Sequence, residues 1–387
     1  MKRNIFIILL SVLLFGCTEE KRPEIVMDSV SPAPVTNVQV QNIPGGAVLK
    51  YQLPDDEDLL YVKALYSLKE GHQAEVKASL YCDTLTIKGF GDEQEREVQI
   101  VAVDRSKNES VPTIVTIKPQ EPPVLAIGKT LELYPDFGGI HLYWENPTRA
   151  EISVILERKD SIGDYEQVEV FYSSVVDGDV VSRGMDTITS DFRVYVQDRW
   201  ENQSVPLEAV LTPLFEMKFD RTKFQALYLD GDEPYAWGWV LPNMFDGNTG
   251  TGFHTETVNG TWPHSCSFDM GVKGKISRIK TFQRQGSYLY HQGNVRYFEL
   301  WGTNDADNLN DWSAWTKLMD CESIKPSGFP LGQTSAEDVA YATAGEEHIC
   351  PINASAVRYL RLKILETWSL ARYSYIMEIE VYGSVEK

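Results

Sequence analysis

The sequence is short of basic residues and of recognisable catalytic motifs. Its 36 Lys and Arg residues stand against 56 Asp and Glu residues, so the formal net charge at pH 7 is −20. A surface of that sign repels phosphate backbones and argues against nucleic acid as a partner. No G-x-S-x-G, H-E-x-x-H or P-loop motif occurs, and the six histidines lack metal-ligand spacing. Acidic residues alone would permit a paired-carboxylate glycosidase, but such sites usually occupy larger catalytic domains. We therefore expect that the protein is not an enzyme.

Cysteine is also scarce, with five residues in the chain. Cys82 is alone in its part of the sequence, which predicts a free, buried thiol. Cys321 and Cys350 bracket a long insertion. An exported protein permits a disulfide between these two. The sequence leaves a disulfide and two unpaired thiols equally open.

The first residues have the pattern of an export signal. Lys2 and Arg3 precede an apolar run over residues 5–15, which is too short to span a bilayer. The run ends in "LFGC", with Cys17 last. This segment resembles the lipobox of bacterial lipoproteins, in which the cysteine is acylated; a secretory signal with an incidental cysteine is the alternative. The acidic "TEE" that follows is typical of Bacteroides-like lipoproteins displayed on the outer surface. The resemblance implies lipidation at Cys17 and a lipid-anchored protein of the outer membrane, facing the extracellular side.

An internal repeat organises the next part of the chain. "VDRSKNESVP" (residues 103–112) matches "QDRWENQSVP" (residues 197–206) position for position, 94 residues later. "GGAVLKYQLP" (residues 45–54) matches "GGIHLYWENP" (residues 138–147) at an offset of 93. A period of this size is that of a β-sandwich module, and the strands within it alternate apolar and polar residues. The repeats resemble fibronectin type III domains, which implies spacer modules. That the modules themselves hold the binding site is the alternative.

The composition changes after the second repeat. Seven of the nine tryptophans lie at or beyond Trp237, so this region is the best candidate for binding something flat and polar. Its loop "FDGNTGTGFHT" (residues 245–255) imitates the start of an EF-hand. An EF-hand needs a carboxylate at its twelfth position, where this chain has Thr257. The loop is therefore not an EF-hand.

Five segments in this region resemble discoidin-like domains, also called coagulation-factor C-type domains. After the D-G-N loop come "WPHSCSFDMG", "SRIKTFQRQ", "YFELWGTND", "VRYLRLKI" and "MEIEVYG", in the family's order. The resemblance covers about 170 residues and implies a galactose-binding-like jelly-roll sandwich. Many bacterial members are carbohydrate-binding modules, and their D-G-N loop commonly holds a structural calcium ion. The implied Ca²⁺ ligands are oxygens of Asp246, Asn248, Thr251 and Glu378; a metal-free turn capped by Asp246 is the alternative.

The same resemblance implies a glycan site. The histidine of the family's T-x-W-H stretch is His254, although Phe253 replaces the tryptophan before it. Arg284 corresponds to an arginine at the end of a strand, and Gln292 takes the place of an asparagine. Stacking rings would come from the last long loop and its neighbours. A surface ion pair for Arg284 and a core position for Trp368 are the alternatives. The implied glycan contacts are His254, Arg284, Trp368, Tyr373, Gln292, Trp262 and Tyr290.

The sequence thus predicts an all-β protein of tandem β-sandwiches. The expected parts are a signal peptide (residues 1–17), a tether (18–34), two fibronectin III-like sandwiches (35–119 and 120–213) and a discoidin-like domain (214–387). This organisation resembles surface lipoproteins encoded in the polysaccharide-utilization loci of Bacteroides-like bacteria. It implies capture of a polysaccharide or oligosaccharide without catalysis, beside other proteins of the uptake locus. The alternative is an adhesive or structural surface protein that binds another protein of the uptake complex or of the host matrix.

Overall fold

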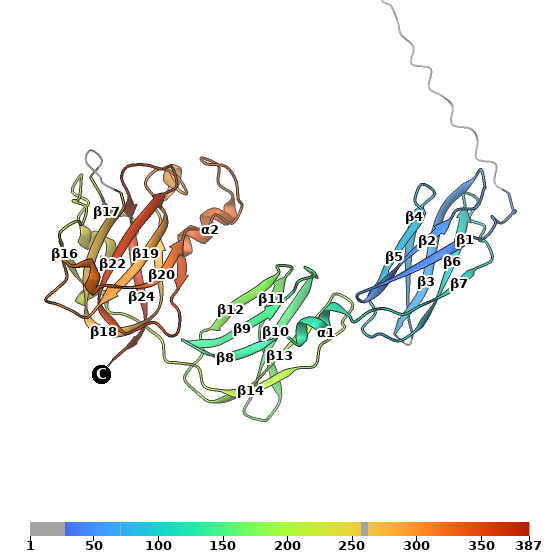
Figure 1. Ribbon diagram of the computed structural model, residues 1–387, viewed down its shortest axis with the longest axis horizontal. Helices are drawn as coiled ribbons and strands as arrows, with labels where there is room; N and C mark the ends of the chain where they lie inside the picture. The colour runs from blue at the N-terminus through green and yellow to red at the C-terminus, as the bar shows by residue number, and fades with distance from the viewer. Residues whose placement is uncertain (1–27, 70, 257–261, 387) are drawn as a thin grey trace, which may run out of the picture. The chain divides into compact units, whose positions relative to one another are not determined.

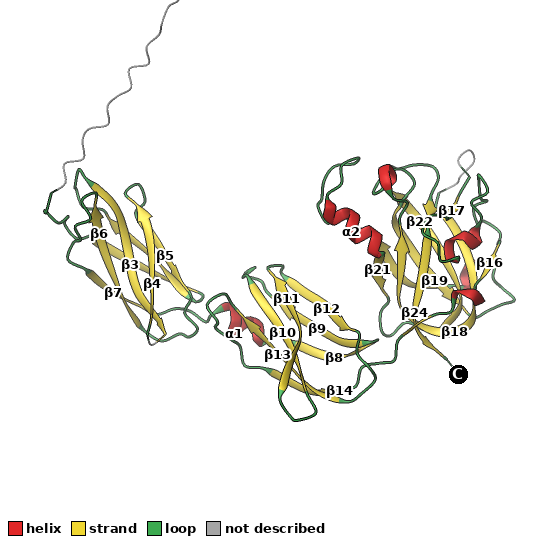
Figure 2. Cartoon of the chain, turned by 180° about the vertical axis from the view of Figure 1, so that it is seen from behind, coloured by secondary structure: helices red, strands yellow, loops and turns green. Residues whose placement is uncertain are grey.

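A computed structural model describes residues 28–69, 71–256 and 262–386. Antiparallel sheets dominate it, as Figure 1 and Figure 2 show, and the prediction of an all-β protein of tandem sandwiches is confirmed. The signal peptide with Cys17, and tether residues 18–27, lie outside the described residues. Within the described ranges, no helix is both long and apolar enough to cross a membrane.

The two repeats fold with one topology. Each has a three-stranded sheet facing a four-stranded sheet, and their orders are β1-β2-β5 with β4-β3-β6-β7, then β8-β9-β12 with β11-β10-β13-β14. Side chains that alternate along these strands fill the cores, and Leu49 and Leu142 are fully buried at equivalent places in β2 and β9. The first repeat comprises β1 (Thr36–Ile43), β2 (Gly46–Gln52), β3 (Leu59–Lys69), β4 (His72–Ser79), β5 (Thr84–Lys88), β6 (Arg96–Asp104) and β7 (Thr113–Ile117).

A short helix, α1 (Pro123–Gly128), precedes the strands of the second repeat. Contacts divide the chain into two compact units: one runs to Ala126 and includes Gln197–Gln203, and the other holds the rest. Trp200 belongs to the first unit, where an added Cβ on Gly89 would lie 2.8 Å from the indole Nε1. This tryptophan therefore packs against backbone. The second repeat comprises β8 (Glu132–Asp136), β9 (Gly139–Glu145), β10 (Ile152–Lys159), β11 (Tyr165–Ser173), β12 (Asp177–Arg183), β13 (Ser190–Gln197) and β14 (Leu207–Leu211).

The matched D-x-x-x-N-x-S motif forms the same turn in both repeats. In the first, the Asn108 amide donates to Asp104 at 2.9 Å, and Ser110 Oγ accepts from the backbone N–H of Ala102 at 3.0 Å. Equivalent bonds of 2.8 and 3.0 Å occur in the second. The motif repeats because these side chains satisfy backbone groups where the strand ends. In the second repeat, Asn202 donates to Asp198, and Ser204 accepts from the backbone N–H of Val196.

The C-terminal region is built on one eight-stranded sheet and a two-stranded sheet, β17-β23. Residues 262–271 and 277–285, expected as two strands, fall largely in one long strand, β18 (His264–Phe282), whose pairing with β22 shifts register between Asp269 and Gly274. Its core is apolar and includes Phe268, Leu300 and Leu362. The remaining elements are β15 (Met217–Lys218), β16 (Gln225–Leu227), β17 (Phe253–His254), β19 (Val295–Thr303), β20 (Thr316–Glu322), α2 (Ala336–Ala344), β21 (Glu346–Ile349), β22 (Val357–Thr367), β23 (Tyr375–Ile376) and β24 (Glu378–Val385).

The cysteines within the described residues are free thiols. Cys82 is a free thiol but is exposed, so its predicted burial is wrong: it lies in the turn before β5, outside the sheet. Cys321 and Cys350 are buried free thiols.

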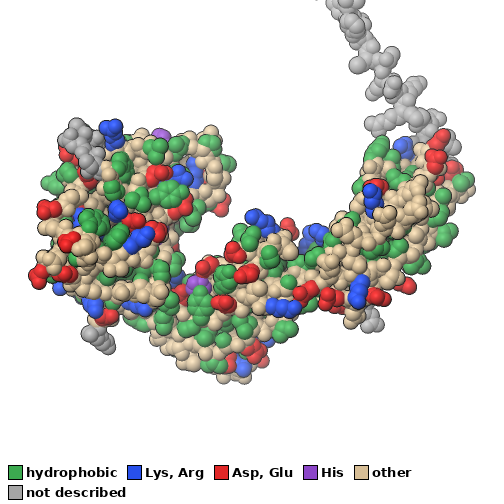
Figure 3. Space-filling model, in the orientation of Figure 1, with side chains coloured by type: hydrophobic (Ala, Val, Ile, Leu, Met, Phe, Trp, Pro, Cys, Tyr) green, Lys and Arg blue, Asp and Glu red, His purple; other side chains and the backbone are tan. Residues whose placement is uncertain are grey.

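Acidic and basic side chains are interspersed on the face that Figure 3 shows, without a basic patch.

Candidate functional site

His254 is fixed by the small β17-β23 sheet. It pairs with Tyr375, its backbone N–H donates to Trp239 O at 3.2 Å, and its carbonyl accepts from Ala236 N at 2.9 Å. Backbone on both sides therefore holds this residue. Its side chain is buried, with 7% exposed.

The tautomer of the His254 side chain follows from the hydrogen bond between its ring and the backbone. Nδ1 lies 2.7 Å from the carbonyl oxygen of Thr255, and a carbonyl can only accept, so Nδ1 carries the hydrogen. Burial, with the nearby positive charge of Arg284, lowers the pKa of His254. The ring is therefore neutral at pH 7, and its Nε2 is a hydrogen-bond acceptor.

Aromatic rings surround this imidazole. Tyr373 stacks on it at 5.2 Å with an interplanar angle of 13°. Tyr375 lies tilted at 5.3 Å, and Trp239 meets it edge-on at 6.0 Å. These three rings, with His254 and Arg284, are called the His254 cage below. A cage of this kind offers apolar faces around a few polar atoms, as small-ligand sites do.

Arg284 supplies the donors of the cage. Its guanidinium carbon lies 3.7 Å from the ring centre of Tyr288 and 5.0 Å from that of Trp239. Its backbone is fixed by Asn294, whose amide oxygen accepts from Arg284 N at 2.8 Å and whose amide nitrogen donates to Arg284 O at 3.1 Å. Among the described residues, the guanidinium has these ring contacts and no ion pair or hydrogen bond. Its N–H groups therefore remain available to a planar or multi-hydroxyl acceptor.

Gln292 completes one side of the site. Its side-chain oxygen accepts from the Tyr373 hydroxyl at 3.2 Å, and its backbone N–H donates to Ser369 Oγ at 2.6 Å. Four predicted contact residues thus lie in one connected cluster: His254, Arg284, Tyr373 and Gln292.

Trp262 lies close to this cluster but not within it. Its ring stacks on His264 at 4.2 Å and is 37% exposed. His264 Nδ1 in turn lies 3.2 Å from Ser374 Oγ. Since Ser374 lies between Tyr373 and Tyr375, Trp262 is connected to the cage through two residues, His264 and Ser374.

The structure does not bring Trp368 and Tyr290 into the cage. Tyr290 is fully buried and packs with Leu289 and Ala342, and Trp368 packs against that cluster. The Trp368 indole N–H donates to Ser323 Oγ at 3.0 Å. A ligand-facing position is excluded for Tyr290, which the insertion containing α2 covers. Trp368 is half-buried outside the cage, and its indole N–H is occupied by Ser323 of the same insertion.

Sequence reasoning missed Trp239, which lies 15 positions before His254 and outside the matched segments. Only the antiparallel pairing of residues 235–239 with 253–255 brings it to the site. The motif "WGW" gave no cue to that pairing. Tyr288 and Tyr375 also line the site.

The D-G-N loop is internally hydrogen-bonded. Asp246 accepts from Thr251 Oγ1 at 2.7 Å and from Asn248 N at 2.7 Å, while Asn248 Oδ1 caps Gly250 N at 3.0 Å. Glu378, 2% exposed, accepts from the N–H of Gly247. All four predicted ligands thus make hydrogen bonds within this loop; Asp246 and Asn248 are exposed, and Glu378 is buried.

The charges around this loop suit a hard cation in part. Burial and, less strongly, the charge of Asp246 raise the pKa of Glu378 to about 7, so an exposed carboxylate acts on a buried one. Oxygen donors of that kind fit Ca²⁺. Arg221, however, lies against Gly247, where an added Cβ would be 2.0 Å from its guanidinium carbon. The arginine already supplies one positive charge to the loop.

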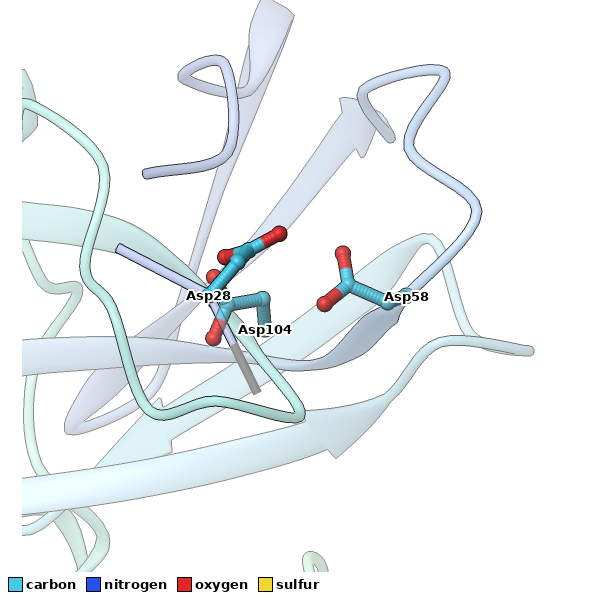
Figure 4. Close-up of side chains that lie close together, drawn as sticks. All are labelled: Asp28, Asp58 and Asp104. Atoms are coloured by element: carbon cyan, nitrogen blue, oxygen red, sulfur yellow. The ribbon is translucent and has the colours of Figure 1, made fainter. Parts of the chain in front are cut away.

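A second acidic group lies in the first repeat (Figure 4). Carboxylate oxygens of Asp28, Asp58 and Asp104 lie within 4.8 Å of one another. The Asn108 amide donates to both Asp28 and Asp104, at 3.3 and 2.9 Å. Asp104 therefore has a structural role in the turn motif that both repeats share.

Comparison with known proteins identifies the family. Three domain families of unknown function match, DUF4959 over residues 32–119, DUF5126 over 120–222 and DUF5000 over 243–383. A search of curated proteins found no match. A solved structure described as SusE-like protein BT2857 is 35% identical, with 68% of this chain and 100% of that chain covered and a TM-score of 0.45. On that identity over the whole of the relative's length, the chain belongs to the SusE-like family.

Two further solved structures from Bacteroides fragilis are similar to part of this chain. The C-terminal domain of a chitobiase is 18% identical, with 44% of this chain and 100% of that chain covered and a TM-score of 0.33. An F5/8 type C domain is 13% identical, with 44% and 97% covered and a TM-score of 0.30. Likenesses at these values carry no argument about function.

Proposed function

We propose that this protein is a non-catalytic, cell-surface glycan-binding lipoprotein that captures polysaccharide or oligosaccharide through its C-terminal domain. The observation that carries the proposal is the His254 cage. It combines a neutral imidazole acceptor, an arginine with free donors and several ring faces. Sugars present hydroxyls that need such donors and acceptors, and apolar ring faces that stack on aromatic side chains.

Membership of the SusE-like family supports the cellular setting. Together with the lipobox-like "LFGC", it favours a protein held by acylated Cys17 on the outer membrane, facing the medium. A single cage of this size would bind a sugar at Kd on the order of 0.1–1 mM. Many copies on one surface would raise the effective affinity through avidity. Other proteins of an uptake locus are the expected partners.

The D-G-N loop would have a structural role in this proposal. Asp246, Thr251 and Glu378 would hold Ca²⁺, with Asn248 shaping the turn. A bound Ca²⁺ would supply a fixed positive charge between the carboxylates and stiffen the loop that leads into β17. The residues themselves act by positioning: the loop sets where Phe253 enters the core and where His254 emerges beside Tyr373.

The test is affinity electrophoresis and a glycan array against plant, host and microbial polysaccharides, with and without EDTA. The native protein should bind at least one polysaccharide without shortening it, and His254→Ala should lose that binding. Loss of binding or of thermal stability in EDTA would support the calcium role, and indifference to EDTA would remove it. Failure to bind any glycan would contradict the proposal and favour the protein-binding alternative.

A further inference from the structure

The turn formed by residues 236–239 has an unusual residue at its tip. Trp239 N donates to Ala236 O at 2.9 Å, and the two central residues have positive φ, 60° at Trp237 and 75° at Gly238. Two positive φ values in a tight turn are the pattern of a type I′ turn, whose central positions favour Gly, Asn and Asp. A bulky tryptophan in the left-handed region is strained.

No packing accounts for that strain. Trp237 is 77% exposed, the most exposed of the nine tryptophans, and no ring contact joins it to another described residue. Asn or Gly would satisfy the backbone better, and a polar residue would suit the solvent better. A strained residue at an exposed loop tip is a candidate for function.

The turn is fastened to the His254 cage. On either side of Trp237, the backbone of Ala236 and Trp239 makes the two hydrogen bonds that hold His254, and Trp239 is itself a wall of the cage. Tyr235, two residues earlier and 48% exposed, bridges to Thr255. The exposed indole is therefore held at a fixed place next to the cage.

We propose that Trp237 forms a second stacking subsite beside the His254 cage, so that the protein takes an oligosaccharide of two or more sugar rings. This inference rests on the proposed function. The cage holds one sugar through Arg284 and His254, and the indole receives the apolar face of the next ring. An exposed aromatic plane suits a sugar because it needs no further polar partner. Trp237 lies outside the residues 243–383 matched by a domain family.

The experiment titrates the full-length protein with gluco-, manno-, xylo- and N-acetylglucosamine oligosaccharides of one, two, four and six units, by calorimetry and tryptophan fluorescence. Trp237→Gly is the test variant because glycine accepts the positive φ and keeps the turn. Tyr172→Ala is the matched control, since that ring is 83% exposed on β11 in the second repeat. Arg284→Ala removes the cage donors.

The native protein should bind a tetrasaccharide at least fivefold more tightly than the monosaccharide of the same series. Trp237→Gly should lose that gain, keep the monosaccharide affinity and melt at the native temperature or above it. Arg284→Ala should weaken both lengths, and Tyr172→Ala neither. Length-independent binding, or tetrasaccharide binding by Trp237→Gly within twofold of native, would overturn the second subsite and leave the proposed function standing. No binding of any probe by the native protein would overturn both.

Discussion

At the residue scale, the site depends on side chains whose protonation and hydrogen bonds are set by burial. Nε2 of His254 can accept a hydrogen bond because Nδ1 donates its hydrogen to the carbonyl of Thr255. The guanidinium of Arg284 can donate because it packs on aromatic rings and pairs with no carboxylate among the described residues. Glu346, in β21 of the C-terminal region, is a second buried titratable group, and its side chain is acidic. It is 1% exposed, accepts from the Gln283 amide, and its Oε2 has no hydrogen-bond partner among the described residues.

Glu346 should make stability depend on pH. Burial raises the pKa of Glu346 from 4.5 to about 7. The folded state then binds the proton more tightly than the unfolded state, so the free energy of unfolding falls as pH rises from about 4.5 to 7, by up to about 3 kcal/mol. Glu346→Gln should reduce this decline in urea denaturation between pH 5 and pH 8, and Glu378, whose pKa is also raised to about 7, should keep part of it. Glu337→Gln, at an exposed position on α2, is the control and should leave the decline in place; an equal decline in Glu346→Gln would refute the assignment.

The sequence predicted part of the site at this scale. His254, Arg284, Tyr373 and Gln292 were found because a family pattern marks them, and the structure places them together. Trp239 and Trp237 could not be found, because only strand pairing brings residues 235–239 beside 253–255. The burial of Tyr290 could not be predicted, because packing by the α2 insertion leaves no mark in the short motif around that residue.

At the element scale, the turn motif of the repeats is the clearest link from sequence to fold. Ser204, 6% exposed, accepts from the backbone N–H of Val196 within the second repeat. Alternation along the strands let the sequence predict both sandwiches. The alternation could not show that β18 continues past residue 271. The register shift between Asp269 and Gly274 interrupts the alternation, and the sequence on its two sides has the pattern of two separate strands.

Ser204→Ala should destabilise the protein by about 1–3 kcal/mol, because it leaves the buried Val196 N–H without an acceptor. Thermal and urea denaturation would measure the loss. Gln203→Ala, one residue earlier and exposed, is the control and should change stability by less than about 0.5 kcal/mol. A Ser204→Ala protein as stable as the control would show that the motif does not stabilise the turn.

At the scale of the whole molecule, two sandwiches separate the proposed lipid anchor at Cys17 from the proposed glycan-binding domain along the chain. Cys17→Ala should move the protein from the membrane fraction to a soluble fraction and abolish labelling by a fatty-acid probe, because the acylated thiol is lost. Cys82→Ala is the control, since Cys82 is an exposed free thiol in the first repeat. Membrane retention of Cys17→Ala, or labelling that depends on Cys82, would contradict lipidation at Cys17.

The central claim is that the His254 cage binds glycan through the free donors of Arg284. The most direct measurement is a calorimetric titration of the native protein, Arg284→Ala and Arg372→Ala with the polysaccharide that binds best in the array. Arg372 is an exposed arginine next to Tyr373 and serves as the control. The account predicts at least a tenfold weaker Kd for Arg284→Ala, a loss of about 1.4 kcal/mol or more, with Arg372→Ala unchanged. Equal affinities in all three proteins would place glycan binding elsewhere and contradict the account.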